Sequence, residues 1–121
     1  MAILRNLSFL FVLTFLLSSC ASKYAETDLH GKWEVKEWKE MSTNKVMNGK
    51  MDMDFDANGQ YNIAFDSDNE KGKYWLMGEF LHTIEEGQSE KKVKIMNLTS
   101  DSLVLQMNRG GEMEKVILLK K

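Results

Sequence analysis

The chain contains no proline, a single cysteine (Cys20) and only two histidines (His30 and His82) among its 121 residues. The lack of proline favours uninterrupted strands, because proline cannot donate to a β-ladder. One cysteine excludes an internal disulfide. The 16 Lys and Arg residues are balanced by 18 Asp and Glu residues and form no basic patch interleaved with aromatics, so we expect no nucleic-acid partner. No nucleophile–base arrangement is indicated, so we expect neither an enzyme nor a cofactor.

A long apolar run is also missing. Residues 7–17 are mostly apolar, but a transmembrane helix needs about 20 such residues. Preceded by Arg5, the run has the proportions of a secretory signal core. Leu17-Ser18-Ser19-Cys20 then resembles the bacterial lipobox, in which cleavage precedes a cysteine that becomes lipidated. The alternative is an ordinary signal peptide with an incidental cysteine.

These features predict three parts: a signal peptide over 1–19, a lipidated Cys20 with a tether over 20–29, and one domain over 30–121. We expect the membrane to be a partner through the lipid anchor. Ala21-Ser22-Lys23 has none of the acidic residues that resemble a surface-export signal, which favours the outer membrane and its periplasmic face.

The clearest pattern in the domain lies over 51–65. Large apolar residues occupy every second position, at Met51, Met53, Phe55, Tyr61, Ile63 and Phe65. A period of two places these side chains on one face of a strand–turn–strand unit. Asp56-Ala57-Asn58-Gly59 has the composition of the turn. The hairpin is marginal alone and needs more sheet to cover its apolar face.

Similar patterns continue along the chain and predict an all-β fold. Trp33 and Val35 share one face of the first strand, and a bulge near Glu37 would return Trp38 to it. For the fifth strand the sequence does not decide which face is buried: Phe80, His82 and Ile84 lie on one face, and Leu81 and Thr83 lie on the other. Strands are predicted over 31–41, 46–55, 60–65, 72–77, 80–85, 93–98, 103–107 and 113–119. Eight short strands at this spacing favour a single small antiparallel up-and-down β-barrel, with an open sandwich as the alternative.

Several motifs carry a family resemblance. The chain is similar to the small lipocalin-like lipoproteins of Bacteroidetes-type bacteria, and the similarity covers nearly all of it after Cys20. Lipocalins open with Gly-x-Trp, matched here by Gly31-Lys32-Trp33. The other matching segments are Phe55 to Tyr61 through Gly59, Gly72-Lys73-Tyr74, and Ile95-x-x-Leu98-Thr99 leading to Leu103-Val104-Leu105. The resemblance implies a barrel that binds a small apolar ligand.

A barrel of this size has an interior filled by side chains or room for one small ligand. We therefore expect a monomeric, membrane-anchored binding module in the cell envelope. The alternative is a non-enzymatic interaction or inhibitor protein with a packed core. The residues predicted to contact a small hydrophobic ligand are Trp33, Met51, Met53, Phe55, Tyr61, Ile63, Phe65, Tyr74, Leu103 and Leu105.

One motif points weakly to a metal. Asp54-Phe55-Asp56-Ala57-Asn58-Gly59 matches the first half of a calcium loop, but Phe65 stands where the bidentate Glu should be. We therefore interpret Asp56 and Asn58 as turn residues and predict no metal site.

Overall fold

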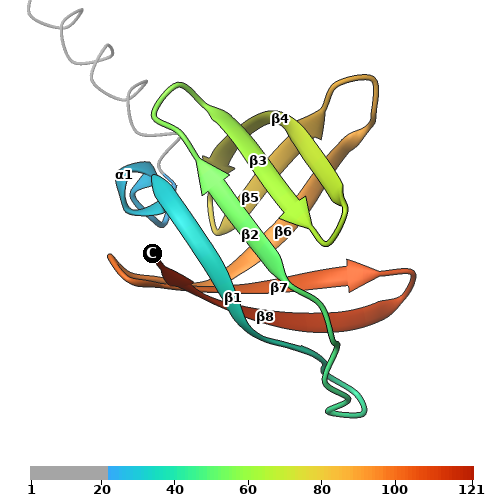
Figure 1. Cartoon of the computed structure of the whole chain (residues 1–121). Coiled ribbons are helices and arrows are strands. Elements are labelled where there is room, and N and C mark those ends of the chain that lie inside the picture. The colour runs from blue at the N-terminus through green and yellow to red at the C-terminus, as the bar shows by residue number, and fades with distance from the viewer. Residues whose placement is uncertain (1–21) are drawn as a thin grey trace, which may run out of the picture.

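The computed structural model describes residues 22–121, which form eight antiparallel strands and one short helix (Figure 1). The predicted signal peptide and Cys20 lie outside the described residues. No helix within 22–121 has the length and apolar character needed to span a membrane. The elements are α1 Glu26–Leu29, β1 Gly31–Glu40, β2 Met51–Phe55, β3 Gln60–Phe65, β4 Asp68–Met77, β5 Phe80–Glu85, β6 Glu90–Leu98, β7 Ser102–Arg109 and β8 Glu112–Lys120.

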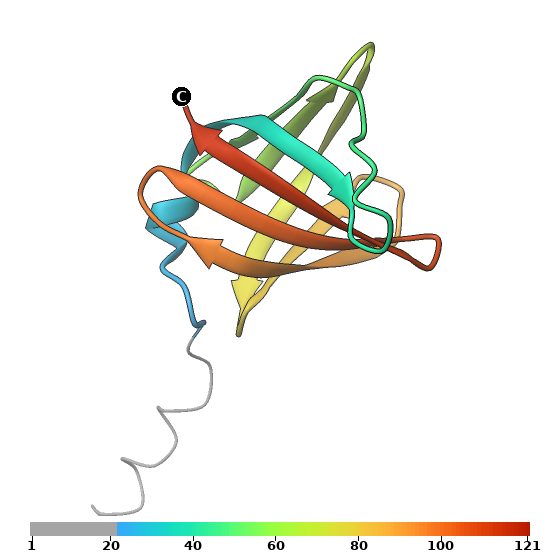
Figure 2. The same cartoon turned by 90° about the horizontal axis from the view of Figure 1, so that it is seen from below.

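The strands form a closed up-and-down barrel. Each strand pairs with the next along the chain, and β1 pairs with β8 to complete the ring. Figure 2 shows this closure, with the red β8 beside the teal β1. The predicted barrel is therefore confirmed, and the open sandwich is not the architecture.

The β2–β3 hairpin has the predicted register. Phe55 pairs with Tyr61. In the turn, Asp56 Oδ1 accepts hydrogen bonds from the backbone N–H groups of Asn58 and Gln60, at 2.9 Å each. Gly59 has a φ of 80°, a conformation that glycine adopts without steric cost. Asp56 thus serves the turn, as the sequence predicted.

Two bulges set which side chains enter the barrel. The β1–β8 register shifts between Val35 and Glu37, which confirms the predicted bulge and lets both Trp33 and Trp38 be buried. A second shift, in β6, falls between Ile95 and Asn97. The residue at that shift, Met96, is 42% exposed.

Some predicted strand limits were wrong. The predicted strand over 46–55 begins only at Met51, and Val46 makes an isolated bridge to Lys39 while remaining 59% exposed. Conversely, β4 begins at Asp68, because the turn takes only residues 66 and 67. Asp66 adopts a φ of 49°, which Asp tolerates better than most residues. The extra β4 residues are polar, and this composition concealed the strand.

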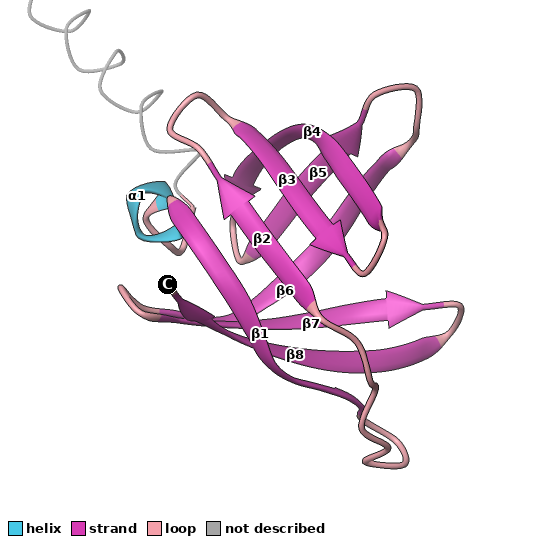
Figure 3. Cartoon of the chain, in the orientation of Figure 1, coloured by secondary structure: helices cyan, strands magenta, loops and turns pink. Residues whose placement is uncertain are grey.

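The two ends of the barrel differ. At the closed end, α1 lies against the opening (Figure 3), and its last residue, Leu29, is fully buried. The indole Nε1 of Trp33 donates to the Leu29 carbonyl at 2.8 Å, and the Tyr74 hydroxyl donates to the carbonyl of Asp56. Residues 26–29, which the sequence assigned to the tether, therefore form a helical plug at this end. We call the opposite end, reached by the β1–β2, β3–β4, β5–β6 and β7–β8 connections, the mouth.

Candidate ligand-binding cavity

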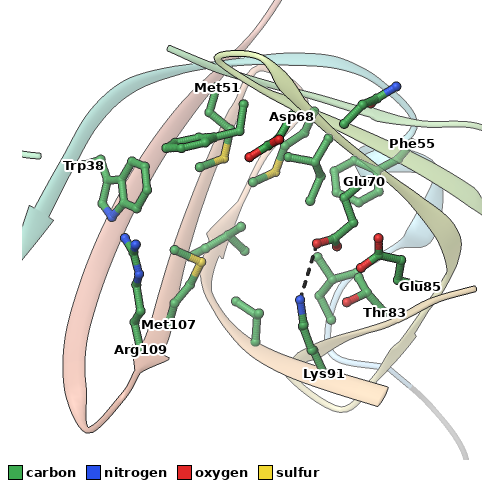
Figure 4. Close-up of a pocket in the computed structure, with 17 residues that line it drawn as sticks. Trp38, Met51, Phe55, Asp68, Glu70, Thr83, Glu85, Lys91, Met107 and Arg109 are labelled. Atoms are coloured by element: carbon green, nitrogen blue, oxygen red, sulfur yellow. Dashed lines mark hydrogen bonds and ion pairs between the residues drawn. The ribbon is translucent and has the colours of Figure 1, made fainter. Parts of the chain in front are cut away.

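A cavity of about 570 Å³ occupies the mouth half of the barrel (Figure 4). This volume lies in the range of small-molecule sites. Its apolar lining comes from Trp38, Met51, Met53, Phe55, Ile63, Phe65, Leu81, Val93, Leu105 and Met107. Its polar lining comes from Asp68, Asn69, Glu70, Thr83, Glu85, Lys91 and Arg109.

The strand period explains this division. Met53, Phe55 and Leu105 are buried and form the apolar part of the cavity. Further toward the mouth the inward positions of β4 become polar, and Asp68 and Arg109 at the strand ends are exposed. The cavity is therefore amphipathic, with an apolar interior and a charged rim.

The β4–β5 side of the cavity is a connected polar wall. The Tyr61 hydroxyl donates to Glu70 Oε2 at 2.6 Å, and Lys91 Nζ lies 3.3 Å from Glu70 Oε1. Burial, reinforced by the hydrogen bond to Glu70 and its charge, raises the pKa of the Tyr61 hydroxyl well above its usual value. Thr83, also on this wall, is buried. Glu70 thus already has two partners within the protein.

The opposite side carries an indole and a guanidinium. Trp38 is 6% exposed and packs edge-to-face on Phe65, with ring centroids 5.4 Å apart. The Arg109 guanidinium lies 5.6 Å from the Trp38 ring centroid, and Figure 4 shows the indole nitrogen on the side nearest to it. Within residues 22–121, Trp38 Nε1 has no hydrogen-bond partner and Arg109 forms no ion pair.

One further charged group lies near this side. Glu114 on β8 pairs with Met107 across the sheet and is 2% exposed, and its Oε1 has no partner among the described residues. Glu114 is not part of the cavity lining. Its carboxylate nevertheless lies next to Met107, on the same face of the sheet.

The structure brings six of the ten predicted ligand-contact residues to the cavity: Met51, Met53, Phe55, Ile63, Phe65 and Leu105. The other four lie outside the cavity lining. Trp33, Tyr61, Tyr74 and Leu103 are buried but do not line it. They belong to the packed core, because inward-facing positions near the closed end are covered by neighbouring strands and by α1.

Sequence reasoning identified none of the seven polar lining residues. The sequence did contain a pattern that indicates two of them. Asp68, Glu70, Gly72 and Tyr74 occupy alternate positions, so in one continuous strand their side chains share the inward face of Tyr74. The charged composition of 66–71 predicted a turn and hid this pattern. The structure also decides the face of β5 that the sequence left open: Leu81 and Thr83 are buried, while Phe80, His82 and Ile84 are only partly so.

Comparison with known proteins supports the architecture. A family model described as a lipocalin-like domain matches residues 29–105. A lipocalin-like protein from Bacteroides uniformis has a similar structure, with a TM-score of 0.58, 19% identity, and coverage of 78% of this chain and 99% of that one. An uncharacterized protein from Bacteroides eggerthii gives a TM-score of 0.59, 16% identity, and coverage of 76% and 98%. At these identities the two structures are evidence for the fold alone. A search of curated proteins finds no match.

Proposed function

This chain belongs to the lipocalin-like domain family, and from that premise we propose that it binds, without catalysis, a small ligand with an apolar body in its barrel. The observation that carries the proposal is the cavity of about 570 Å³ lined by ten apolar side chains. Burial of apolar ligand surface there is favourable by roughly 25 cal/mol per Å².

The polar rim suggests how such a ligand is oriented. Trp38 Nε1 is a donor only, and the Arg109 guanidinium also only donates. Trp38 Nε1 is itself covered, but the neighbouring Arg109 guanidinium is exposed and forms no ion pair within residues 22–121, so it favours a hydrogen-bond acceptor or an anion. On the opposite wall Glu70 already binds Tyr61 and Lys91. We therefore propose an amphipathic ligand whose acceptor or acidic head lies on the Trp38 side.

A fluorescent fatty-acid analogue tests the cavity. It should bind the purified protein with saturation, and Met53→Trp should abolish binding by filling the cavity, since Met53 is buried and lines it. Ala64→Trp is the matched control, because Ala64 is exposed on the neighbouring strand and outside the lining. Saturable binding that survives Met53→Trp, or no binding to the unaltered protein, would refute the proposal.

We further propose that the protein is lipid-anchored through Cys20 at the periplasmic face of the outer membrane. The support is the apolar run over 7–17 followed by Leu17-Ser18-Ser19-Cys20. The several acyl chains of a bacterial lipoprotein would anchor firmly, since each buried CH₂ contributes about 0.8 kcal/mol. Cys20→Ser should release the protein from membranes or leave it unprocessed. Correct processing with unchanged membrane fractionation of this variant would contradict the anchor.

A second candidate function is supported by the β1–β2 connection at the mouth. Met41 and Val46 are exposed large apolar residues there, 42% and 59% exposed. Such side chains on a loop suit contact with a protein partner. Lack of ligand binding, together with loss of a co-purifying protein in a Val46→Asp variant, would favour this function over ligand carriage.

A further inference from the structure

The chain enters the barrel at a defined place on the closed end. The Lys23 backbone N–H donates to the Gly78 carbonyl in the β4–β5 turn at 2.8 Å. The Tyr24 ring packs against the core, and its hydroxyl lies 3.4 Å from the carbonyls of Ile95 and Met96 in the β6 bulge. Figure 2 shows the blue N-terminal segment at the same end as the yellow β4–β5 turn.

An apolar and basic surface surrounds this entry point, and we call it the entry patch: Lys23, Met77, Phe80, Lys92, Lys94 and Met96. Met77 and Met96 are 59% and 42% exposed. Lys92 Nζ lies 4.2 Å from the centroid of Phe80. Glu79 is the acidic residue of the turn, and Lys23 and Lys94 each approach it at 3.7 Å, so the three lysines of the patch share this one paired carboxylate.

We propose that the entry patch rests on an anionic lipid bilayer, so that the closed end of the barrel faces the membrane and the mouth faces away from it. This inference rests on the proposed lipid attachment at Cys20. Three residues extend at most about 11 Å, so an acylated Cys20 would hold Lys23 close to the lipid headgroups. Exposed thioethers beside lysines fit such an interface, because lysines close to an anionic bilayer surface are attracted to it.

The orientation has a consequence for ligand exchange. Strand β4 begins at Asp68 in the cavity rim and ends at Met77 in the entry patch, ten residues that span roughly 30 Å. The rim of the cavity is therefore held well away from the bilayer. A ligand would exchange with the aqueous compartment or a soluble donor, and not directly with membrane lipid.

The test uses the full chain, purified with its attached lipid and reconstituted into phosphatidylethanolamine–phosphatidylglycerol vesicles. Met77→Cys places a label in the entry patch, and Val46→Cys is the matched control at the mouth, because both residues are 59% exposed. Cys20 is the only native cysteine, so once it is acylated the introduced thiol alone takes the label. Headgroup-quencher lipids should quench the Met77 label several-fold more strongly than the Val46 label. Met96→Cys should behave like Met77→Cys.

Intact-mass measurement and vesicle flotation separate the two possible failures. A protein that carries acyl chains and floats, but whose Met77 and Val46 labels are quenched equally, overturns the orientation and leaves the anchor standing. A protein without acyl chains removes the anchor and the orientation with it. Raising the salt concentration should weaken quenching of the Met77 label, because the lysine contribution is screened.

Discussion

Replacement of Arg109 by Gln tests whether the cavity recognises the polar head group of the proposed ligand. The change removes the positive charge at the rim and keeps a polar side chain. It leaves the apolar interior around Met53 and Leu105 untouched. Binding of an acid should therefore weaken, whereas binding of the corresponding uncharged alcohol should not.

The expected size follows from the cavity. About 570 Å³ accommodates on the order of ten to twenty non-hydrogen atoms at ~30 Å³ each, which suits dodecanoate. Ten buried methylenes contribute about 8 kcal/mol at ~0.8 kcal/mol each. Loss of translational and rotational freedom costs at least about 4 kcal/mol. A charge-assisted contact with Arg109 adds about 1.5–3 kcal/mol.

The net free energy of about 6 kcal/mol corresponds to a Kd in the tens of micromolar. Because Arg109 is exposed and the buried Glu114 carboxylate lies next to Met107 on the same face of the sheet, the lower end of the head-group contribution applies. Arg109→Gln should then weaken dodecanoate binding about tenfold, equivalent to about 1.4 kcal/mol.

Isothermal titration calorimetry with dodecanoate and dodecanol at equal ionic strength measures both effects. Lys115→Gln is the control, since Lys115 lies on β8 outside the cavity lining and removes the same charge. The reasoning fails if Arg109→Gln weakens the acid and the alcohol equally, or if Lys115→Gln has the same effect on the acid. Either result would assign the change to packing or to net charge.

Three further predictions concern the fold and are measured by urea unfolding. Phe55→Ala should lower the free energy of unfolding by about 3–5 kcal/mol and Asp54→Ala by under about 0.5, because Phe55 is fully buried and Asp54 is not; equal losses would contradict the alternation. Gly72→Ala should cost about 1–3 kcal/mol, because its Cβ would lie 2.0 Å from the Ile84 carbonyl oxygen; unchanged stability would contradict this close approach. Burial, then the charges of Glu26 and Asp56, raises the pKa of Tyr74 from 10.0 to about 12. The folded state keeps that proton after the unfolded chain loses it, so stability should fall between pH 10 and 12, and by less in Tyr74→Phe.

The strands whose limits were predicted well are those bounded on both sides by turn residues. Segments 60–65 and 80–85 were predicted with the limits of β3 and β5, because turn residues flank each apolar run. The bulge near Glu37 could also be inferred, since Trp33 and Trp38 fall out of phase unless one residue is extra. Apolar periodicity carries this information wherever one face is buried.

The same reasoning failed where the inner face is polar. Asp68 and Glu70 line the solvent-accessible rim of the cavity, so burial does not favour apolar side chains at these positions. This part of β4 therefore has the composition of a turn. The sequence also did not show which inward-facing residues belong to the packed core and which line the cavity. Tyr74 and Met53 both occupy inward-facing positions of their strands. The barrel is closed near Tyr74 by α1 and the β2–β3 turn, whereas Met53 faces the cavity. Which end is plugged depends on contacts between segments distant in sequence.

The polar groups of the cavity indicate which way a ligand lies. A buried polar group without a partner is unfavourable by about 1–3 kcal/mol, so a ligand gains most where it supplies a missing partner. On the β4–β5 wall Glu70 is already bound by Tyr61 and Lys91. Across the cavity the exposed Arg109 guanidinium forms no ion pair within the described chain. An acceptor group placed on that side meets a guanidinium, whereas the same group beside Glu70 meets a carboxylate. On the proposed function, the ligand head would therefore lie beside β7, and its apolar body beside Met53, Phe55 and Leu105.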